Sequence, residues 1–272
     1  ENNIVTMREK LLKKASDLKI IPSLNGTLNN AIRILGNSDI SVNDLRDVIE
    51  HDIFLTAKII GIANSAYYNR GAEIFSLSQA ILNIGLQETK GIIICLLFIE
   101  NIKKTISIRR KDLFDFCKHS LSVACSAKVL SEKTYAEDPQ KAYISSMLHD
   151  IAKIIFYADV HNYHSLLQKA NMNGNSLSEI EKDALGIDHQ EIGYIIGKKW
   201  KMPEAICSVI KHHHKDTFTD KYKELIKITQ LSNNFYRRPD YNTNPEQLIL
   251  LKVKGEIEQE INRYMEVISI NC

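Results

Sequence analysis

The apolar positions of this chain fall into stretches with helical spacing, and residues that start helices stand before many of them. In a capping box, a Ser, Thr or Asp side chain and a residue three positions later satisfy the first free backbone N–H groups of a helix. Four such pairs occur here: Ser41 with Asp44, Ser76 with Gln79, Ser176 with Glu179, and Asp188 with Glu191. Each pair predicts the start of a helix.

Proline and glycine predict further helix boundaries. Asp138 followed by Pro139 indicates an N-cap with proline at the first helical position, where the missing N–H costs no hydrogen bond. Gly36, Gly85 and Gly186 stand where a left-handed residue would end a helix.

Evidence for β-strands is weak. The run from Gly91 to Glu100 begins with β-branched residues, but it lies within a longer apolar pattern from Gln87 to Ile102. That length favours a buried helix. No alternating stretches are joined by an Asn-Gly or Asp-Gly turn. The sequence therefore predicts an all-α fold.

Two polar joints, residues 103–111 and 217–221, divide the chain. We expect two packed helical subdomains, residues 1–108 and the histidine-bearing residues 109–215, followed by a C-terminal helical extension over 216–272. The extension is expected to hold helices near 220–236 and 245–268, broken by the segment from Arg238 to Pro245.

Composition narrows the class of protein. With 44% hydrophobic residues, 25% charged residues and a formal net charge of +2, the 272-residue chain can bury a sizeable core. It lacks the concentrated basic face that nucleic acid requires, and Arg109-Arg110-Lys111 fits a solvated loop. Five cysteines without a CxxC pair indicate buried thiols in a reducing compartment. The sequence starts without a signal-peptide pattern, and its longest apolar run, residues 92–99, is too short to cross a bilayer. We therefore expect a cytoplasmic protein without nucleic-acid or membrane partners.

Histidines are concentrated in one part of the chain. Eight of the nine lie between His119 and His214, where uniform scatter would place about three. The sharpest element is the adjacent pair His149-Asp150, after the apolar stretch 142–148. Neighbouring helical residues point about 100° apart, so both can address one ion only near a helix end or from adjacent faces. Lys153 could pair with Asp150 or contact a phosphate.

These histidines occur in motifs that resemble a known superfamily. His119 begins a run of small residues, Asp188-His189 precedes Gln-Glu-Ile-Gly, and a triple histidine ends at His214. Together with His149-Asp150, the set resembles the HD metal-dependent phosphohydrolases. The N-terminal half resembles the HDOD (HD-related output domain) branch, through Ile-Pro22-Ser-Leu, residues 49–68 with their Ala-Asn-Ser-Ala-Tyr-Tyr stretch, and residues 76–86. The likeness covers about residues 18–215 and implies that the second subdomain is an HD-type helical bundle.

The resemblance also implies metal ligands. His119, His149 and Asp150 match the first metal site, and Asn233 takes the place of the Asp that closes it in the superfamily. An amide oxygen can still ligate, but it brings no negative charge. His189, His213 and His214 resemble second-ion ligands of the related HD-GYP phosphodiesterases. Because the Gly-Tyr-Pro signature is absent and Lys215 stands where a Glu follows the His pair, we do not expect cyclic-di-GMP hydrolysis.

Several of these residues also have plainer interpretations. His189 could be a half-exposed residue after an N-cap, and residues 212–214 a solvated helix end. We expect His161 and His164 at the surface and a structural role for His51. Gly193 and Gly197 suit close helix packing, and Trp200 a packing anchor. The 63–68 stretch either locks a helix turn through Asn64 and Ser65, which we favour, or binds a partner.

Two function hypotheses follow. The first is a bacterial signal-transduction module with a degenerate metal site that binds signalling proteins or a nucleotide. The second is a metal-dependent phosphohydrolase, in which Asp150 orients a metal-activated water and Lys153 steadies the developing charge. Asn233 favours the first hypothesis, because it weakens the site. The ion is expected to be Fe, Mn, Zn or Mg, and the sequence does not indicate an oligomeric state.

Overall fold

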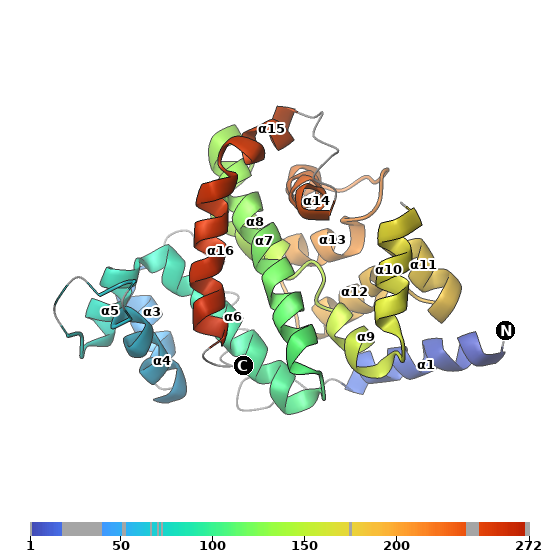
Figure 1. Cartoon of the computed structure of the whole chain (residues 1–272), viewed down its shortest axis with the longest axis horizontal. Coiled ribbons are helices and arrows are strands. Elements are labelled where there is room, and N and C mark those ends of the chain that lie inside the picture. Colours follow the sequence, from blue (N-terminus) through green and yellow to red (C-terminus); the bar gives the residue numbers. More distant parts are fainter. Residues whose placement is uncertain are drawn as a thin grey trace. The chain divides into compact units, whose positions relative to one another are not determined.

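The structure, a computed structural model, describes residues 2–17, 40–50, 53–65, 67–69, 71, 73–173, 176–237 and 245–269. All regular structure in these residues is helical, which confirms the all-α fold (Figure 1). The helices are α1 (Asn2–Asp17), α3 (Val42–Ile49), α4 (Ile53–Ala63), α5 (Leu77–Ile84), α6 (Leu86–Thr105), α7 (Arg110–Thr134), α8 (Pro139–Met147), α9 (Lys153–Asp159), α10 (Tyr163–Asn173), α11 (Leu177–Leu185), α12 (His189–Lys199), α13 (Glu204–His212), α14 (Lys223–Arg237), α15 (Pro245–Lys252) and α16 (Lys254–Ser269). None of the described helices is both long enough and apolar enough to cross a bilayer.

The chain divides into two compact units, residues 1–19 with 103–262, and residues 20–102 with 263–272. This division differs from the boundaries that we expected at residues 108 and 215. Helix α1 lies with the histidine-bearing helices, because its buried Leu11 and Ala15 belong to a face that packs against α9, α11 and α12. Helix α14 also belongs to that unit, where it packs against α7, α8 and α13.

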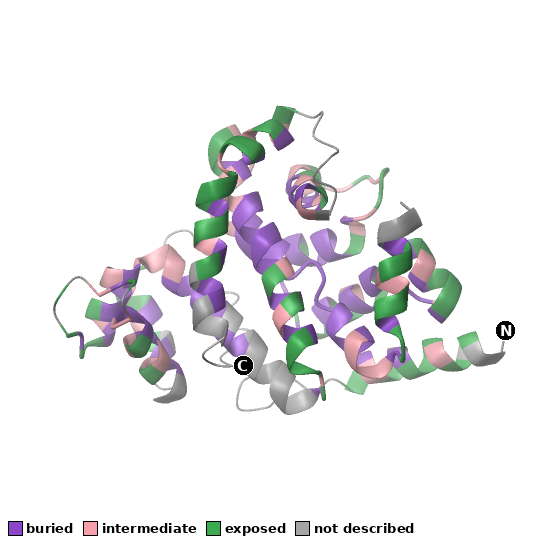
Figure 2. Ribbon diagram, in the orientation of Figure 1, coloured by how far each residue is buried: buried purple, intermediate pink, exposed green. Residues whose placement is uncertain are grey.

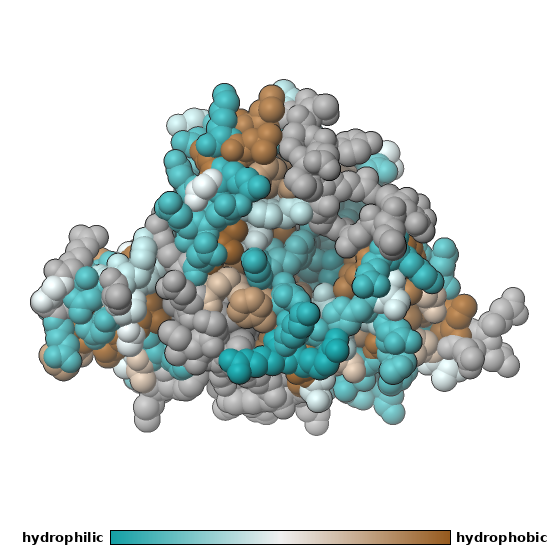
Figure 3. All heavy atoms as spheres, viewed as in Figure 1, coloured by the Kyte–Doolittle hydropathy of each residue, from teal (hydrophilic) through white to brown (hydrophobic). Residues whose placement is uncertain are grey.

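The larger unit is built around α7, which packs against α8 and α14. Every residue of α7 from Ser120 to Ala127 is buried, and six of these eight are Ser, Ala or Cys, so the neighbouring helices can approach closely. Figure 2 shows the buried residues of this unit gathered along α7, α8, α12 and α13. Exposed hydrophobic residues occur at its α15 end, where Leu248 is 47% and Leu251 38% exposed (Figure 3).

Two glycines let α12 pack tightly on α13, as their spacing predicts. A Cβ at Gly193 would lie 2.6 Å from Ile210 Cγ2, and one at Gly197 would lie 3.1 Å from Cys207 Sγ. Both distances are too short for an ordinary carbon contact. The helices that carry His189 and precede His213 are therefore held at a separation that only glycine allows. Trp200, at the end of α12, is buried as expected.

In the smaller unit, asparagine side chains fix the loop between α4 and α5. Asn64 accepts a hydrogen bond from Ile74 N (2.8 Å) and donates one to Ile74 O (2.7 Å). Asn83 donates to the Tyr68 carbonyl. The Ala-Asn-Ser-Ala-Tyr-Tyr stretch thus uses Asn64 to hold a turn, as we favoured.

The predicted helix caps are confirmed in part. Ser41 and Asp44 form a reciprocal capping box, Asp138 accepts from Lys141 N, and Asp188 accepts from Glu191 N. Ser76 and Ser176 stand at N-cap positions, but their side chains form no cap hydrogen bond, so these two capping boxes are wrong. At Ser176 the backbone carbonyl, instead of the hydroxyl, accepts from Glu179 N and Ile180 N.

The predicted helix ends are confirmed only in part. Gly186 has a left-handed φ of +73° and ends α11 as predicted. Gly85, with φ +102°, ends α5, whereas Gly36 lies outside the described residues. The single helix expected over 245–268 is wrong, because a turn at Val253 separates α15 from α16. Gly255 follows this turn, and glycine costs about 1 kcal/mol relative to alanine inside a helix.

Candidate metal centre

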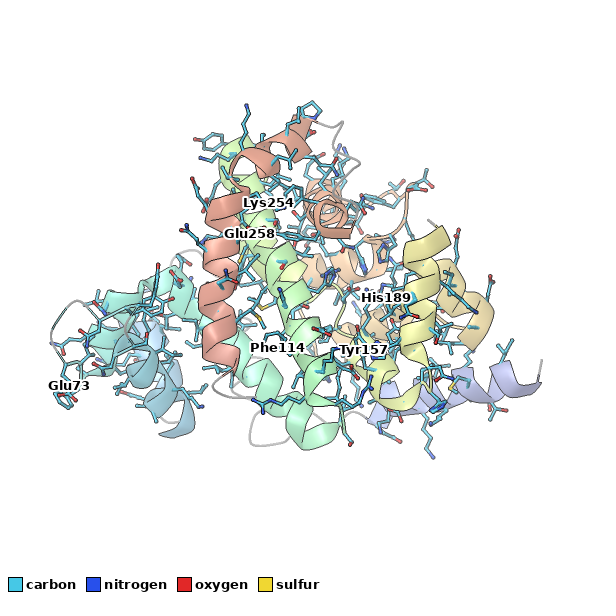
Figure 4. All side chains as sticks on the ribbon, in the orientation of Figure 1. Glu73, Phe114, Tyr157, His189, Lys254 and Glu258 are labelled. Carbon is cyan, nitrogen blue, oxygen red and sulfur yellow. The ribbon has the colours of Figure 1, made fainter. Side chains whose placement is uncertain are left out.

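Separate helices of the larger unit bring the candidate ligands together. His119 lies on α7, and His149 and Asp150 lie in the turn between α8 and α9. His189, labelled in Figure 4, is the first residue of α12. His213 and His214 follow the end of α13. The adjacent His149 and Asp150 can face one point because they lie in a turn, where the 100° helical offset does not apply.

The Asp150 carboxylate is the point where these side chains meet. Its Oδ2 lies 3.2 Å from His119 Nε2 and 3.1 Å from His149 Nε2. Its Oδ1 lies 3.3 Å from both His189 Nε2 and His213 Nε2. These two Nε2 atoms are 3.2 Å apart. The structure therefore brings residues 119, 149 and 150 together, as the motifs predict, and places His189 and His213 on the other side of the same carboxylate.

The contacts of the Nδ1 atoms assign the tautomers of these rings. His149 Nδ1 is 2.6 Å from Ser146 O, His213 Nδ1 is 2.9 Å from Ile210 O, and His189 Nδ1 is 2.5 Å from Glu181 Oε2. Each Nδ1 has its acceptor oxygen at hydrogen-bond geometry, whereas neither His149 Nε2 nor Asp150 Oδ1 forms a hydrogen bond within the described residues, so the proton is assigned to Nδ1. In the neutral ring, Nε2 then holds a lone pair. Three such nitrogens face Asp150, and this arrangement is repulsive unless a cation lies among them.

The pKa values favour neutral imidazoles beside an ionised carboxylate. Burial lowers the pKa of His213 to about 4, and it also lowers the pKa values of His149 and His214. Burial alone would raise the pKa of Asp150, but its neighbours, chiefly His149 and Lys153, outweigh burial and hold that pKa well below its usual value. Neutral imidazole nitrogens and a carboxylate are the ligands that Zn, Fe and Mn take in proteins. The residues present therefore fit a divalent metal ion.

Two overlapping groups in the described part of the chain have ligand atoms within 4.8 Å of one another. The first consists of His119, His149 and Asp150, and the second of Asp150, His189, His213 and His214. Asp150 belongs to both. His214 joins the second group with its ring edge-on to His189, at 5.0 Å between ring centroids.

Lys153 contacts the candidate metal ligands, whereas Asn233 has no hydrogen bond to them within the described residues. Lys153 is buried, and its Nζ lies 2.5 Å from Asp150 Oδ2, so in this structure it pairs with the carboxylate. Asn233 lies on α14, which packs against α7 and α8. It is 1% exposed, and neither end of its amide hydrogen-bonds within the described residues. A buried unsatisfied amide costs about 1–3 kcal/mol, which is consistent with a ligand role that stays a prediction.

The sequence analysis missed Glu181 and Tyr163. Glu181 on α11 is fully buried and accepts hydrogen bonds from His189 N (2.9 Å), His189 Nδ1 and the Tyr163 hydroxyl (2.6 Å). Burial and the charge of Glu181 raise the pKa of Tyr163 well above its usual value, so the hydroxyl keeps its proton. A signal was available: Glu181 lies four residues from both Leu177 and Leu185, on the buried face of α11. An acidic residue in that position needs a partner.

The other histidines lie away from Asp150 or outside the described residues. His161 and His164 are exposed, as expected, although His164 Nε2 lies 2.9 Å from Asp112 Oδ1. His212 stacks on Phe218 with 5.7 Å between ring centroids. His51 lies outside the described residues.

The helical scaffold and the His-Asp pair define the class as an HD-type helical protein. The model of the HDOD domain matches residues 21–216, and the chain therefore belongs to the HDOD domain family. It is 24% identical over 255 residues to an uncharacterized protein of Treponema pallidum (strain Nichols). The match covers 90% of this chain but only 48% of that protein, so the chain spans about half the length of this relative.

Three solved structures share the fold. An HDOD domain protein of unknown function from Geobacter sulfurreducens has a TM-score of 0.76 at 19% identity, with 98% of each chain covered. A candidate signal transduction protein from Marinobacter aquaeolei VT8 has a TM-score of 0.73 at 16% identity, covering 98% of this chain and 65% of the other. A candidate phosphohydrolase from Shewanella amazonensis SB2B has a TM-score of 0.66 at 20% identity, covering 94% and 96%. At these identities the likeness shows the fold alone.

Proposed function

We propose that this chain is a regulatory module of bacterial signal transduction that holds a divalent metal ion in a closed centre and acts by binding a signalling protein or a nucleotide. His119, His149, Asp150 and Asn233 would hold one ion, and Asp150, His189, His213 and His214 a second. The nitrogen-rich ligand set favours Fe, Mn or Zn over Mg, which prefers oxygen ligands.

One observation carries the metal assignment. Three imidazoles, each with Nδ1 bound to an acceptor, direct Nε2 at the ionised carboxylate of Asp150. The Nε2 lone pairs and the negative carboxylate repel one another in the protein interior. A cation bound among them would be attracted to all of them. Asp150, whose two oxygens face different imidazoles, is suited to bridging two ions.

Burial supports a regulatory role over a catalytic one. The side chains of His149, Asp150, His189 and His213 are 0% exposed. Structural metal sites are closed by protein ligands, whereas catalytic sites keep one position open for water and substrate. The ammonium group of Lys153 is engaged by Asp150, so a substrate phosphate would have to compete for it. The neutral Asn233 also leaves the ion with one negative ligand fewer than the superfamily pattern provides.

A metal-dependent phosphohydrolase is the second candidate, and the sharing of Asp150 between both ligand groups favours it. Two neighbouring ions are typical of phosphatases and nucleases, where they stabilise the attacking and leaving oxygens and acidify a bound water. In this chain Asp150 would orient that water and Lys153 would balance negative charge. The partial exposure of His119, 28% of its side chain, gives this side of the centre contact with solvent.

Elemental analysis of the purified chain tests the proposal. We expect bound Fe, Mn or Zn in the wild-type protein, a large loss in His149→Ala, and unchanged content in the matched control His161→Ala, because His161 is exposed and in neither ligand group. A folded wild-type protein without metal, even after incubation with these ions, would contradict the proposal.

A hydrolysis assay separates the two candidates. Nucleotides and phosphodiesters are incubated with the protein in the presence of Mn or Fe. The regulatory proposal predicts no turnover above the level of the Asp150→Ala variant. Turnover that is abolished by Asp150→Ala would establish the phosphohydrolase instead.

A further inference from the structure

The buried carboxylate of Glu181 connects three consecutive helices of the larger unit. It lies on α11, accepts a hydrogen bond from the hydroxyl of Tyr163 at the start of α10, and accepts hydrogen bonds from the backbone N–H and the Nδ1–H of His189 at the start of α12. Its side chain is 0% exposed, as is that of His189. A carboxylate in such a place is strongly destabilising unless hydrogen bonds compensate it, and these three bonds do so.

A purely structural role for Glu181 would be satisfied by fewer contacts. The bond from His189 N alone caps the first turn of α12, since Glu181 then accepts from a free N–H group at the helix start. The bond from Nδ1 adds something different, because it acts on the ring whose opposite nitrogen lies 3.3 Å from Asp150. A proton held at Nδ1 leaves the lone pair at Nε2, on the side of the candidate metal centre.

We infer that Glu181 is a positioning residue for the metal centre, which holds His189 in the Nδ1–H tautomer and fixes its ring toward Asp150, and that Tyr163 in turn fixes Glu181. This inference rests on the proposed function. A carboxylate behind a ligating histidine orients the ring and strengthens its other nitrogen as a ligand.

The other imidazoles are anchored differently. His149 and His213 donate from Nδ1 to backbone carbonyls, which carry no net charge. Of these three imidazoles, His189 is the one whose Nδ1 lies on a carboxylate. Glu181 should therefore affect the second ligand group, which contains His189, and leave the first group, which contains His119 and His149, unchanged.

Two variants of Glu181 and one matched control test this inference by metal titration. Glu181→Met removes the acceptor and the charge, whereas Glu181→Gln keeps an acceptor oxygen but loses the charge. We expect Co²⁺ affinity of the second group to fall about 100-fold in the first variant and about 10-fold in the second. Glu179→Gln, an exposed residue on the same helix, should bind as the wild type does. In a His189→Ala background the Glu181 substitutions should have no further effect, because their action passes through His189.

Nitrogen NMR of the imidazoles in the metal-free protein provides a readout that needs no ion. Wild type, Glu179→Gln and Glu181→Gln should show the His189 ring with its proton on Nδ1, and Glu181→Met a mixture of both tautomers. Tyr163→Phe, which keeps the carboxylate, should shift affinity in the same direction by a smaller factor and serves if Glu181→Met does not fold. An unchanged tautomer in Glu181→Met, or in its absence unchanged Co²⁺ affinity in Tyr163→Phe, would overturn the inference. If the wild-type protein takes up no ion but Glu181→Met still shows the tautomer change, the proposed function is refuted and the role of Glu181 in positioning His189 stands.

Discussion

His149 and His189 occupy opposite sides of the Asp150 carboxylate, and the structure orients them by different means. Both are fully buried, and their Nε2 atoms lie 3.1 Å from Oδ2 and 3.3 Å from Oδ1. His149 is oriented by the carbonyl of Ser146, three residues earlier at the end of α8. His189 is oriented by Glu181, which lies on another helix. One side of the centre is thus built by local backbone geometry and the other by packing between helices.

Because the two histidines are oriented by different means, the two ligand groups should lose their geometry under different perturbations. The His149 side should persist as long as the end of α8 is formed, because a backbone carbonyl is present whatever side chain the residue carries. The His189 side requires α10, α11, α12 and α13 to keep their mutual positions. Damage to packing should therefore affect the second ligand group before the first.

Removing the charge that both sides share should have the largest effect. Asp150→Asn keeps the shape of the side chain but takes away the negative charge that faces the buried Lys153 ammonium. Breaking a buried ion pair from one side costs about 3–5 kcal/mol. We expect a loss of that order in the free energy of unfolding of the metal-free protein, together with loss of metal from both groups. Urea denaturation and elemental analysis measure the two effects.

A comparison variant makes this result specific. Asp183→Asn changes an exposed carboxylate on α11 and should leave both readings unchanged. If Asp150→Asn were as stable as the wild type, the carboxylate would not be the electrostatic centre of the site.

Acid should destabilise the metal-free protein through the same imidazoles. The pKa of His213 is lowered to about 4 in the folded state, against about 6.5 in the unfolded chain. Between these values the unfolded state binds more protons, so stability that is present above pH 6.5 is lost as the pH falls toward 4. For His213 alone the loss is about 3 kcal/mol. His149 and His214 add to it in the same direction.

Urea titrations between pH 7.5 and 4.5 measure this slope and compare the two sides. His213→Gln should flatten the dependence by removing a group of the second side, and His149→Gln should flatten it for the first. His161→Gln, at an exposed position, should keep the wild-type slope. A wild-type unfolding free energy that stays constant over this range would show that these imidazoles are not held neutral.

Packing between α12 and α13 gives a smaller and more selective effect. Gly193→Ala would place a methyl group 2.6 Å from Ile210 Cγ2, and such overpacking costs about 1–3 kcal/mol. Because α12 carries His189, metal affinity of the second group should fall while the first group keeps its ion. Gly61→Ala in α4 meets no atom within 4 Å and should instead stabilise by about 0.5–1 kcal/mol. Thermal unfolding and metal titration check both variants, and equal losses from both groups would contradict the selective effect.

The fold was predictable where its causes are local. The capping box at Ser41, the proline start at Pro139 and the glycine end at Gly186 each depend on a few neighbouring residues, and the structure contains them. The assignment of α1 to the larger unit depends on Leu11 and Ala15 meeting helices more than a hundred residues away. No pattern within α1 identifies that partner, which is why the expected division of the chain differs from the observed one.

The candidate site also contains residues that the sequence could predict and residues that it could not. His149 and Asp150 are adjacent in the sequence, and the motifs shared with a known family supplied their partners at 119, 189, 213 and 214. Glu181 lies eight residues before His189 and matches no motif that we used. Its role depends on the angle between α11 and α12, and the spacing of residues does not contain that angle. Only the buried acidic position on α11 could have indicated it.

The smallest predicted effect separates backbone anchoring from side-chain anchoring. Ser146→Ala removes the hydroxyl that lies 2.8 Å from Thr229 Oγ1, but it keeps the carbonyl that accepts from His149 Nδ1. Thr229 still donates to Leu225 O, so the loss in unfolding free energy should be about 1 kcal/mol. Ser145→Ala, whose hydroxyl makes no hydrogen bond within the described residues, should cost less. Metal affinity should be unchanged in both variants, in contrast to the loss expected from Glu181→Gln. A comparable loss of affinity in Ser146→Ala would mean that the first side also depends on side-chain packing, and the distinction between the two halves of the centre would disappear.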